Sequence, residues 1–307
     1  MTKLKMKKLK EASLLLAVMV VLTACGNKEN AVKGMDDLKT EIGGSSAETG
    51  EDSTGQGAGN NKGESGETSQ GSSQGSAQDN AQGNVGIPVM VVTELSDHRY
   101  TDDEKLLVQG DFQGAEVTGE GYEAVAEAVQ SYFAEKEQAF RESVDIYEES
   151  ALAELQFSPD FPGYASSVES SGTRVDSSII SIKSFHYDST GGAHPNYGTV
   201  GATFDAKTGF RLSFWDLAAD KDAFAETTLN SCLEQVTAEY GEGLYIDYEE
   251  TIRKVWEEEP NWYLDEVGVN IIFTPYEIGP YAMGEVTVLL PYEEFSGLLK
   301  PEYQMAQ

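Results

Sequence analysis

The sequence predicts an α+β fold, in which an antiparallel sheet packs with one long helix and two further helices after a disordered tether. Two observations carry this prediction. The apolar positions change period along the chain, from the alternation typical of strands to the three- and four-residue steps typical of a helix. The elements also occur in clusters, in the order strands, helix, long strands, helices, strands, and clustering without strict alternation favours an antiparallel sheet.

The long helix is the clearest of the predicted elements. Between Tyr122 and Leu155 the apolar residues recur at helical spacing and define one buried stripe. Shorter stripes predict two more helices, over 224–240 and 248–256. Alternating or continuous apolar runs predict the strands, which we expect over residues 88–98, 104–112, 166–188, 197–204, 262–264, 267–273 and 286–290.

The first 25 residues have the pattern of a bacterial lipoprotein signal. Five lysines precede an apolar run of about a dozen residues, shorter than the ~20 that a membrane-spanning helix needs. The run ends in LTAC at 22–25, and a basic start, a short apolar core and small residues are typical of a cleaved secretion signal. We expect residues 1–24 to be removed and Cys25 to carry a lipid, so that the chain is anchored to the cell membrane on its extracytoplasmic face.

The segment after the lipid site is expected to be a tether. This segment covers residues 25–86, and from 43 to 86 it consists largely of Gly, Ser, Gln, Asn, Thr and Glu, with almost no large apolar side chain. Such a composition cannot offset the entropy of ordering and predicts disorder. The folded domain is expected over 87–303, with an N-terminal part, 87–165, and a C-terminal part, 166–303.

The chain is strongly acidic, with a formal net charge of −32 at pH 7. Loss of residues 1–24 removes five lysines and one glutamate, which leaves 16 basic and 52 acidic side chains and a net charge of −36. This charge excludes nucleic acid as a partner, because binding to a polyphosphate depends on Lys and Arg. The charge would attract a cationic partner, and the alternative is that it only keeps a secreted protein soluble.

No catalytic motif stands out, and we predict that the chain is not an enzyme. The predicted folded domain, 87–303, has no G-x-S-x-G nucleophile elbow, and His98, His186 and His194 do not have the spacing of a metal site. Cys232 falls on a predicted helix and is expected to be a buried structural residue. No cofactor and no metal is predicted, and an envelope hydrolase or metalloenzyme using His186, His194 and nearby carboxylates is the weakest alternative.

Two loops differ from the rest in having both turn-forming and large side chains. In GGAHPN, 191–196, paired glycines adopt backbone shapes closed to other residues. In PYEIGPYAMG, 275–284, two prolines and two glycines interrupt a hairpin that carries tyrosines. Aromatic side chains on a rigid loop suit sugar stacking or a protein contact, and the alternative is that they fold inward over the sheet. The candidate ligand-binding residues are His194, Pro195, Asn196, Pro275, Tyr276, Glu277, Ile278, Pro280 and Tyr281.

These loops belong to a longer resemblance. The segments YDSTGGAHPNYGTVGATFDAKTGFRLSFWDL, 187–217, and NWYLDEVGVNIIFTPYEIGPYAMG, 261–284, are similar to the extracytoplasmic domain of unknown function of RsiV-type anti-sigma factors, which sense lysozyme. They also resemble the non-catalytic N-terminal region of PdaC-type peptidoglycan deacetylases. The resemblance covers about residues 87–300 and implies a compact α+β module without catalytic residues. In the anti-sigma factors such a module binds lysozyme, and in the deacetylases it accompanies a separate catalytic domain.

The chain differs from both groups, because it has a predicted lipid anchor in place of a transmembrane helix and has no deacetylase domain. The sequence therefore predicts a surface-exposed lipoprotein with a non-catalytic domain that recognises a lysozyme-like protein or peptidoglycan. The alternative is a structural accessory of an envelope complex.

Overall fold

The structure is a computed structural model that describes residues 86–304. The predicted signal peptide, Cys25 and the predicted tether up to residue 85 lie outside this range. Within the described range no helix has the length and hydrophobicity of a membrane span. The α+β class is confirmed.

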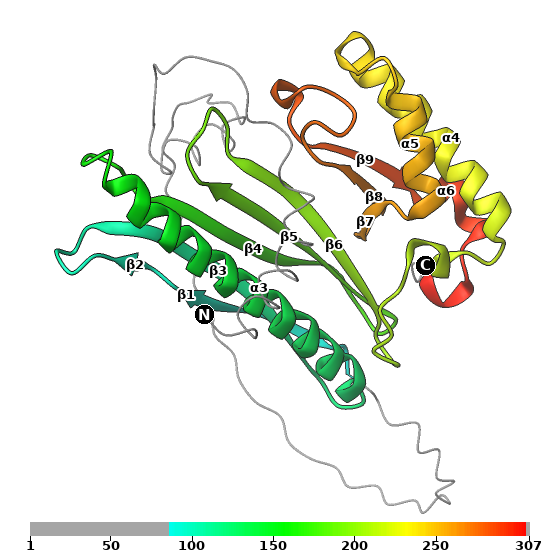
Figure 1. Ribbon diagram of the computed structural model, residues 1–307. Helices are drawn as coiled ribbons and strands as arrows, with labels where there is room; N and C mark the ends of the chain where they lie inside the picture. The colour runs from blue at the N-terminus through cyan, green and yellow to red at the C-terminus, as the bar shows by residue number, and fades with distance from the viewer. Residues whose placement is uncertain (1–85, 305–307) are drawn as a thin grey trace, which may run out of the picture. The chain divides into compact units, whose positions relative to one another are not determined.

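The larger of two sheets has the strand order β1-β3-β4-β5-β6, and the short β2 pairs with β3 (Figure 1). Its strands are β1 (Val89–Ser96), β2 (Arg99–Tyr100), β3 (Leu106–Thr118), β4 (Tyr164–Val175), β5 (Ile179–Ser189) and β6 (Asn196–Asp205).

The sheet is mostly antiparallel, as predicted, and one pair of strands is an exception. β3 and β4 run parallel, whereas β1–β3, β2–β3, β4–β5 and β5–β6 are antiparallel. The cause is the helix α3 (Glu123–Leu155), which follows β3 and carries the chain back before β4 begins. Parallel neighbours need such a crossover, because a tight turn can join antiparallel strands only.

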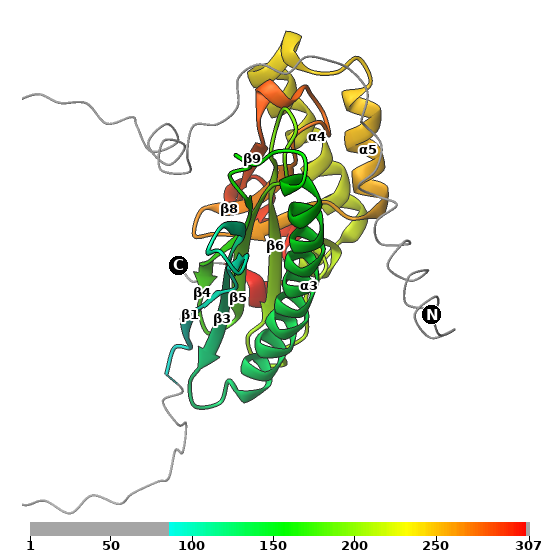
Figure 2. The same cartoon turned by 60° about the vertical axis from the view of Figure 1, so that its left-hand side comes forward.

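α3 covers one face of the larger sheet, as Figure 2 shows. Its buried side chains include Val129, Phe133 and Phe140, and they share a core with Ile180 and Ile182 of β5. The neighbouring Ile179 belongs to the core on the opposite face. Neighbouring residues of β5 thus contribute to different cores, because successive side chains of a strand point to opposite faces.

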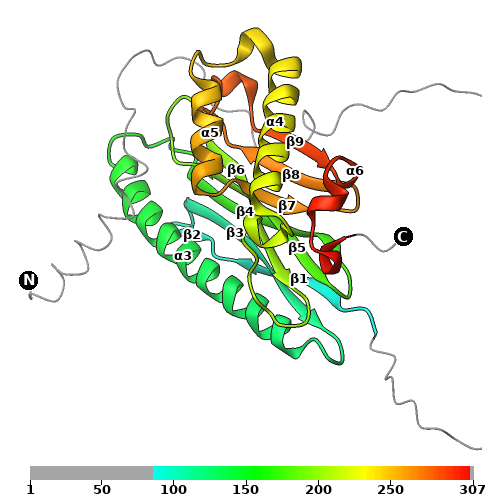
Figure 3. The ribbon, with the colours of Figure 1, turned by 90° about the vertical axis from the view of Figure 1, so that its right-hand side faces the viewer.

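The smaller sheet has the antiparallel order β7-β8-β9, from β7 (Asn261–Leu264), β8 (Gly268–Phe273) and β9 (Val286–Pro291). The helices α4 (Lys221–Tyr240) and α5 (Tyr248–Glu258) lie side by side on this sheet (Figure 3). The remaining short elements are η2 (Phe214–Leu217), η3 (Gly241–Gly243), η4 (Tyr281–Met283), α6 (Tyr292–Phe295), η5 (Ser296–Leu298) and η6 (Pro301–Tyr303).

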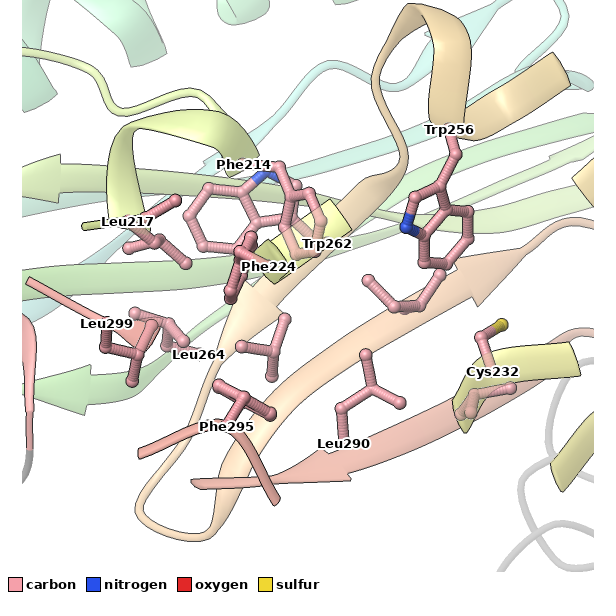
Figure 4. Packing of buried hydrophobic residues seen from close by; sticks show 14 of the residues in the cluster. Phe214, Leu217, Phe224, Cys232, Trp256, Trp262, Leu264, Leu290, Phe295 and Leu299 are labelled. Carbon is pink, nitrogen blue, oxygen red and sulfur yellow. The ribbon is translucent and has the colours of Figure 1, made fainter. Parts of the chain in front are cut away.

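A second core lies between the smaller sheet, α4, α5 and the other face of the larger sheet. Phe214 of η2 is fully buried and packs on Phe224, Trp256 and Trp262 (Figure 4). Aromatic pairs of this kind add stabilisation beyond the area that they bury. They join η2, both helices and β7 into one apolar cluster.

The free edge of β7 lies against the face of the larger sheet, and hydroxyl groups provide partners for its backbone. The Leu264 N–H donates to Ser181 Oγ at 2.8 Å, and the Thr173 hydroxyl donates to the Leu264 carbonyl. Ser181 Oγ also lies 2.9 Å from Thr203 Oγ1 of β6. Side chains of the larger sheet thus bond the N–H and C=O groups at the edge of β7. These bonds matter because a buried backbone group without a partner costs free energy. We call this contact the β7 seam.

Asn261 and Gly201 extend the β7 seam to β6. Asn261 Nδ2 donates to the Thr199 carbonyl at 2.7 Å, and the Gly201 N–H donates to Asn261 Oδ1 at 3.1 Å. A Cβ at position 201 would lie 1.7 Å from the Trp262 carbonyl oxygen. Only glycine allows the two backbones to approach so closely.

We predict that Gly201→Ala destabilises the protein by about 2 kcal/mol or more, since the added carbon must push β7 away from β6. Unfolding in denaturant, followed by tryptophan fluorescence, measures the change. The matched control is Gly297→Ala, where a Cβ would meet nothing within 4 Å, and it should change the free energy of unfolding by less than about 0.5 kcal/mol. Equal stability of the two variants would contradict the role of Gly201.

Candidate functional site

The two loops singled out in the sequence lie against each other. The β5–β6 loop, 189–196, and the β8–β9 segment, 274–284, are at the same end of the described residues (Figure 2). The His194 and Tyr281 rings are stacked, with centroids 4.3 Å apart and planes 24° apart. Tyr276 Oη lies 3.5 Å from His194 Nδ1. We call the group of His194, Tyr276 and Tyr281 the aromatic surface.

Glycines shape the β5–β6 loop. Gly191 and Gly192 have φ of 81° and 104°, a region that side-chain-bearing residues rarely adopt. They turn the chain after β5, and His194 follows as an exposed residue. Asn196 is exposed and starts β6, while Pro195 is half-buried.

The β8–β9 segment is held by internal hydrogen bonds. Glu277 Oε2 accepts from the Thr274 N–H at 2.8 Å and from its hydroxyl at 3.1 Å, and the Glu277 N–H donates to the Thr274 carbonyl at 3.1 Å. These contacts close a turn around Pro275 and Tyr276. Tyr276 has φ of 74°, a left-handed conformation that costs energy for a residue other than glycine. Glu277 therefore stabilises the turn that projects Tyr276.

The prediction that Ile278 contacts a ligand is wrong. It is 1% exposed and belongs to the core of the smaller sheet. Its carbonyl accepts from the Tyr245 N–H at 3.0 Å. The residue anchors the segment and is not available to a ligand, whereas Pro280 nearby is exposed.

Tyr281 is the centre of a set of touching rings. Its centroid lies 5.4 Å from that of Tyr276 and 5.6 Å from that of Tyr197, and Tyr197 in turn contacts Phe185 at 5.9 Å. Burial, followed by the neighbouring tyrosines, raises the pKa of Tyr281 to about 12. Its phenol is therefore protonated at neutral pH and presents a hydrogen-bond donor.

The beginning of β9 is tied to β6 beside these rings. Glu285 accepts from the Thr199 N–H and, at 2.8 Å, from the Thr199 hydroxyl. Gly198 leaves room for Thr274, whose Cγ2 would lie 2.8 Å from a Cβ at position 198. Each of these contacts joins β6 of the larger sheet to the segment between β8 and β9 of the smaller sheet. They therefore hold together the two loops that carry the aromatic surface.

Two exposed residues on the adjoining segment between α4 and α5 are not among the predicted contact residues. Ile246 is fully exposed and Tyr245, whose N–H reaches the β8–β9 segment, is 37% exposed. Tyr276 is 48% exposed. The run LYI at 244–246 was the available signal, because large apolar residues are uncommon in a solvated connection. Exposed carboxylates flank this run at Glu242, Asp247, Glu249 and Glu250.

The histidines do not come together. His98 Nε2 lies 3.0 Å from Asp111 Oδ1 at the start of the larger sheet. Burial, together with the charge of Lys136, lowers the pKa of His186, while Asp188 accepts from the Ser166 hydroxyl at 2.7 Å. Within residues 86–304, no group of three His, Cys, Asp or Glu side chains is placed to hold a metal ion.

Cys232 is fully buried in the core of the smaller sheet, as expected (Figure 4). Burial raises the pKa of its thiol to about 12. The reactive form of cysteine is the thiolate, so the fold suppresses nucleophilic chemistry at this position.

In a chain that carries Cys25→Ala, we predict that Cys232 reacts with a thiol reagent at pH 8 about a thousandfold more slowly than an unhindered cysteine, whose pKa is near 8.5. Absorbance of the released chromophore measures the rate. In denaturant the same thiol should react at the ordinary rate. Rapid stoichiometric labelling of the native chain would contradict the burial.

Comparisons with known proteins give a family match for part of the chain. Residues 216–293 match the family model described as "Protein of unknown function (DUF3298)". This range includes α4, α5 and the smaller sheet with its β8–β9 segment, but not the β5–β6 loop. No curated protein matches the chain.

Two solved structures are similar to the chain. The crystal structure of a DUF3298 family member from Bacteroides fragilis is 18% identical with a TM-score of 0.55, over 71% of this chain and 96% of that one. A DUF3298 family protein from Pseudomonas aeruginosa is 17% identical with a TM-score of 0.47, over 70% and 96% of the two chains. The similarity to the Bacteroides protein is one of fold alone.

Proposed function

We propose that the chain is a non-catalytic, lipid-anchored protein of the cell envelope and that its aromatic surface binds a cationic, lysozyme-like protein. The observation that carries this proposal is the stacking of His194 on Tyr281. It joins two loops that are far apart in the chain into one surface, with Tyr276 projecting from it.

Preorganisation supports a role in binding. Tyr276 is held in a strained backbone conformation by the Glu277 hydrogen bonds, and Ile278 anchors the same segment in the core. Strain of this kind tends to be kept at ligand contacts. A ligand that meets fixed rings loses less entropy on binding than one that must order them.

Charge favours a cationic protein as the ligand. The exposed carboxylates of Glu242, Asp247, Glu249 and Glu250 flank Tyr245 and Ile246 beside the aromatic surface, and the chain as a whole has a net charge of −32. Tyrosines surrounded by acidic groups suit a basic partner, because complementary charge speeds association and rejects acidic competitors. The affinity should then fall as salt screens these charges.

A second candidate ligand is peptidoglycan, and the stacked rings favour it. Flat aromatic faces and a phenolic donor are suited to the apolar face and hydroxyl groups of a sugar. Binding to isolated sacculi that does not depend on salt would favour this ligand over a cationic protein.

We predict that Tyr276→Ala and Tyr281→Ala each weaken lysozyme binding at least tenfold, the loss typical of a central aromatic contact. Biolayer interferometry on the full chain at about 20 and 300 mM salt measures the affinity and its screening. Tyr100→Ala is the matched control, because Tyr100 is 53% exposed on β2 and is outside the aromatic surface. Unchanged unfolding midpoints should accompany the losses. Unaltered affinity in both loop variants would remove the surface as the contact.

The lipid anchor rests on the sequence pattern around Cys25 and is tested separately. We predict that Cys25→Ala abolishes lipid labelling and moves the protein from the membrane fraction to the soluble fraction, because no diacylglycerol can be attached without the thiol. Metabolic labelling with a fatty acid and fractionation measure both. Retention of the Cys25→Ala chain in the membrane fraction would exclude this anchor.

A further inference from the structure

The outer edge of β6 is almost completely covered. In the regular pairing of β5 with β6, alternate residues of β6 direct their backbone groups away from β5. The outward residues are Thr199, Gly201, Thr203 and Asp205, since their N–H or C=O groups bond to partners outside the sheet.

Six of the eight outward groups have a partner. The side chains of Glu285 and Asn261 bond both groups of Thr199 and the Gly201 N–H. At the other end, the segment 209–212 bonds the Thr203 carbonyl and both groups of Asp205. The two groups that no residue in 86–304 bonds are the Gly201 carbonyl and the Thr203 N–H.

These two groups flank Ala202, and Gly201, Ala202 and Thr203 all line a cavity of about 430 Å³. Trp262 and Pro260 also line the cavity. Arg211 lines it as well, and it pairs with Phe204 in the covered part of the β6 edge. Glu259 also lines the cavity, but its Oε1 accepts from the Phe214 N–H at 2.8 Å. The strand edge at the cavity thus has one free backbone acceptor and one free backbone donor, and the lining includes one cation, Arg211, and one carboxylate, Glu259.

Arg211 has no ion-pair partner among the described residues. Its guanidinium lies over the Tyr132 ring, 5.1 Å from the centroid, and this contact fixes the group without neutralising it. Arg211 is exposed and lines the cavity without an ion pair to a described residue, so its charge is available for an anionic ligand.

We propose that this cavity binds the C-terminal residue of a peptide. A residue placed parallel to β6 opposite Ala202 donates its N–H to the Gly201 carbonyl and accepts from the Thr203 N–H, which is the pattern of parallel pairing. Its terminal carboxylate then lies beside Arg211. The peptide must end there, because 209–212 already occupies the edge beyond Thr203.

The same geometry limits the rest of the ligand. Asn261 and Glu285 occupy the edge before Gly201, so the peptide leaves β6 on the N-terminal side of its last residue. The ligand class is thus a short acylated peptide with a free carboxylate. The C-terminus of a protein and the stem peptide of the cell wall both have this chemistry, and they differ in the chirality of the last residue.

The test is calorimetric titration of the full chain with N-acetyl-Ala-Ala-Ala as the free acid and as the C-terminal amide. The acid should bind at least tenfold more tightly, because only the acid pairs with Arg211. Peptides ending in L-Ala or D-Ala distinguish the two sources, and tighter binding of either supports the cavity and identifies its ligand. Hydrogen exchange at the Thr203 amide should slow when the acid is bound.

Arg211→Met should remove the preference for the acid, while Arg211→Lys should retain part of it. Arg253→Met is the matched control, since it removes the same charge from an exposed position on α5 that does not line the cavity. Equal binding of acid and amide, the same preference in Arg211→Met as in the unaltered chain, or no binding of any acid below about 10 mM would overturn the proposal. Tyr276→Ala should leave peptide binding unchanged. The result of the peptide titration is therefore independent of whether the aromatic surface binds a ligand.

Discussion

The arrangement of the two sheets depends on how the free edge of β7 is satisfied. A strand edge buried on the face of another sheet would leave N–H and C=O groups without partners, each at a cost of about 1–3 kcal/mol. Here Ser181 and Thr173 supply hydroxyl partners to Leu264, and Asn261 exchanges two hydrogen bonds with β6. Gly201 makes the approach sterically possible. Polar side chains on a sheet face thus act as structural partners of a second sheet.

The β7 seam also determines where the aromatic surface forms. β7 pairs with β8, β8 pairs with β9, and the segment carrying Tyr281 joins the last two strands. The position of β7 therefore determines how close this segment lies to the β5–β6 loop. The hydrogen bonds that Thr199 donates to Glu285 hold the C-terminal end of the segment. The stacking of His194 on Tyr281 is therefore a result of sheet docking, and it does not depend on either loop alone.

Local pattern predicted the elements well, and contacts between elements were beyond it. The apolar stripe of α3 and the alternation of Ile179 and Ile180 follow from the period of each element. The parallel β3–β4 pair does not, because pairing depends on where the crossover returns. Ile278 has the same local context as the exposed Tyr276 and the half-buried Tyr281, and only the packing of the smaller sheet buries it completely. Whether part of the β6 edge stays unpaired depends on segments that are far apart in the sequence. No single motif could therefore have indicated it.

The aromatic surface takes one ring from each side of the β7 seam, since His194 follows β5 of the larger sheet and Tyr281 precedes β9 of the smaller one. Any molecule that engages both rings therefore spans the junction between the two sheets, which share the core that contains Ile179 and Trp262. By mass action, occupancy then favours the docked arrangement over one in which the sheets have parted, by an amount that grows with ligand concentration. The bound partner thus stabilises the contact between the two sheets, and its dissociation makes their separation easier.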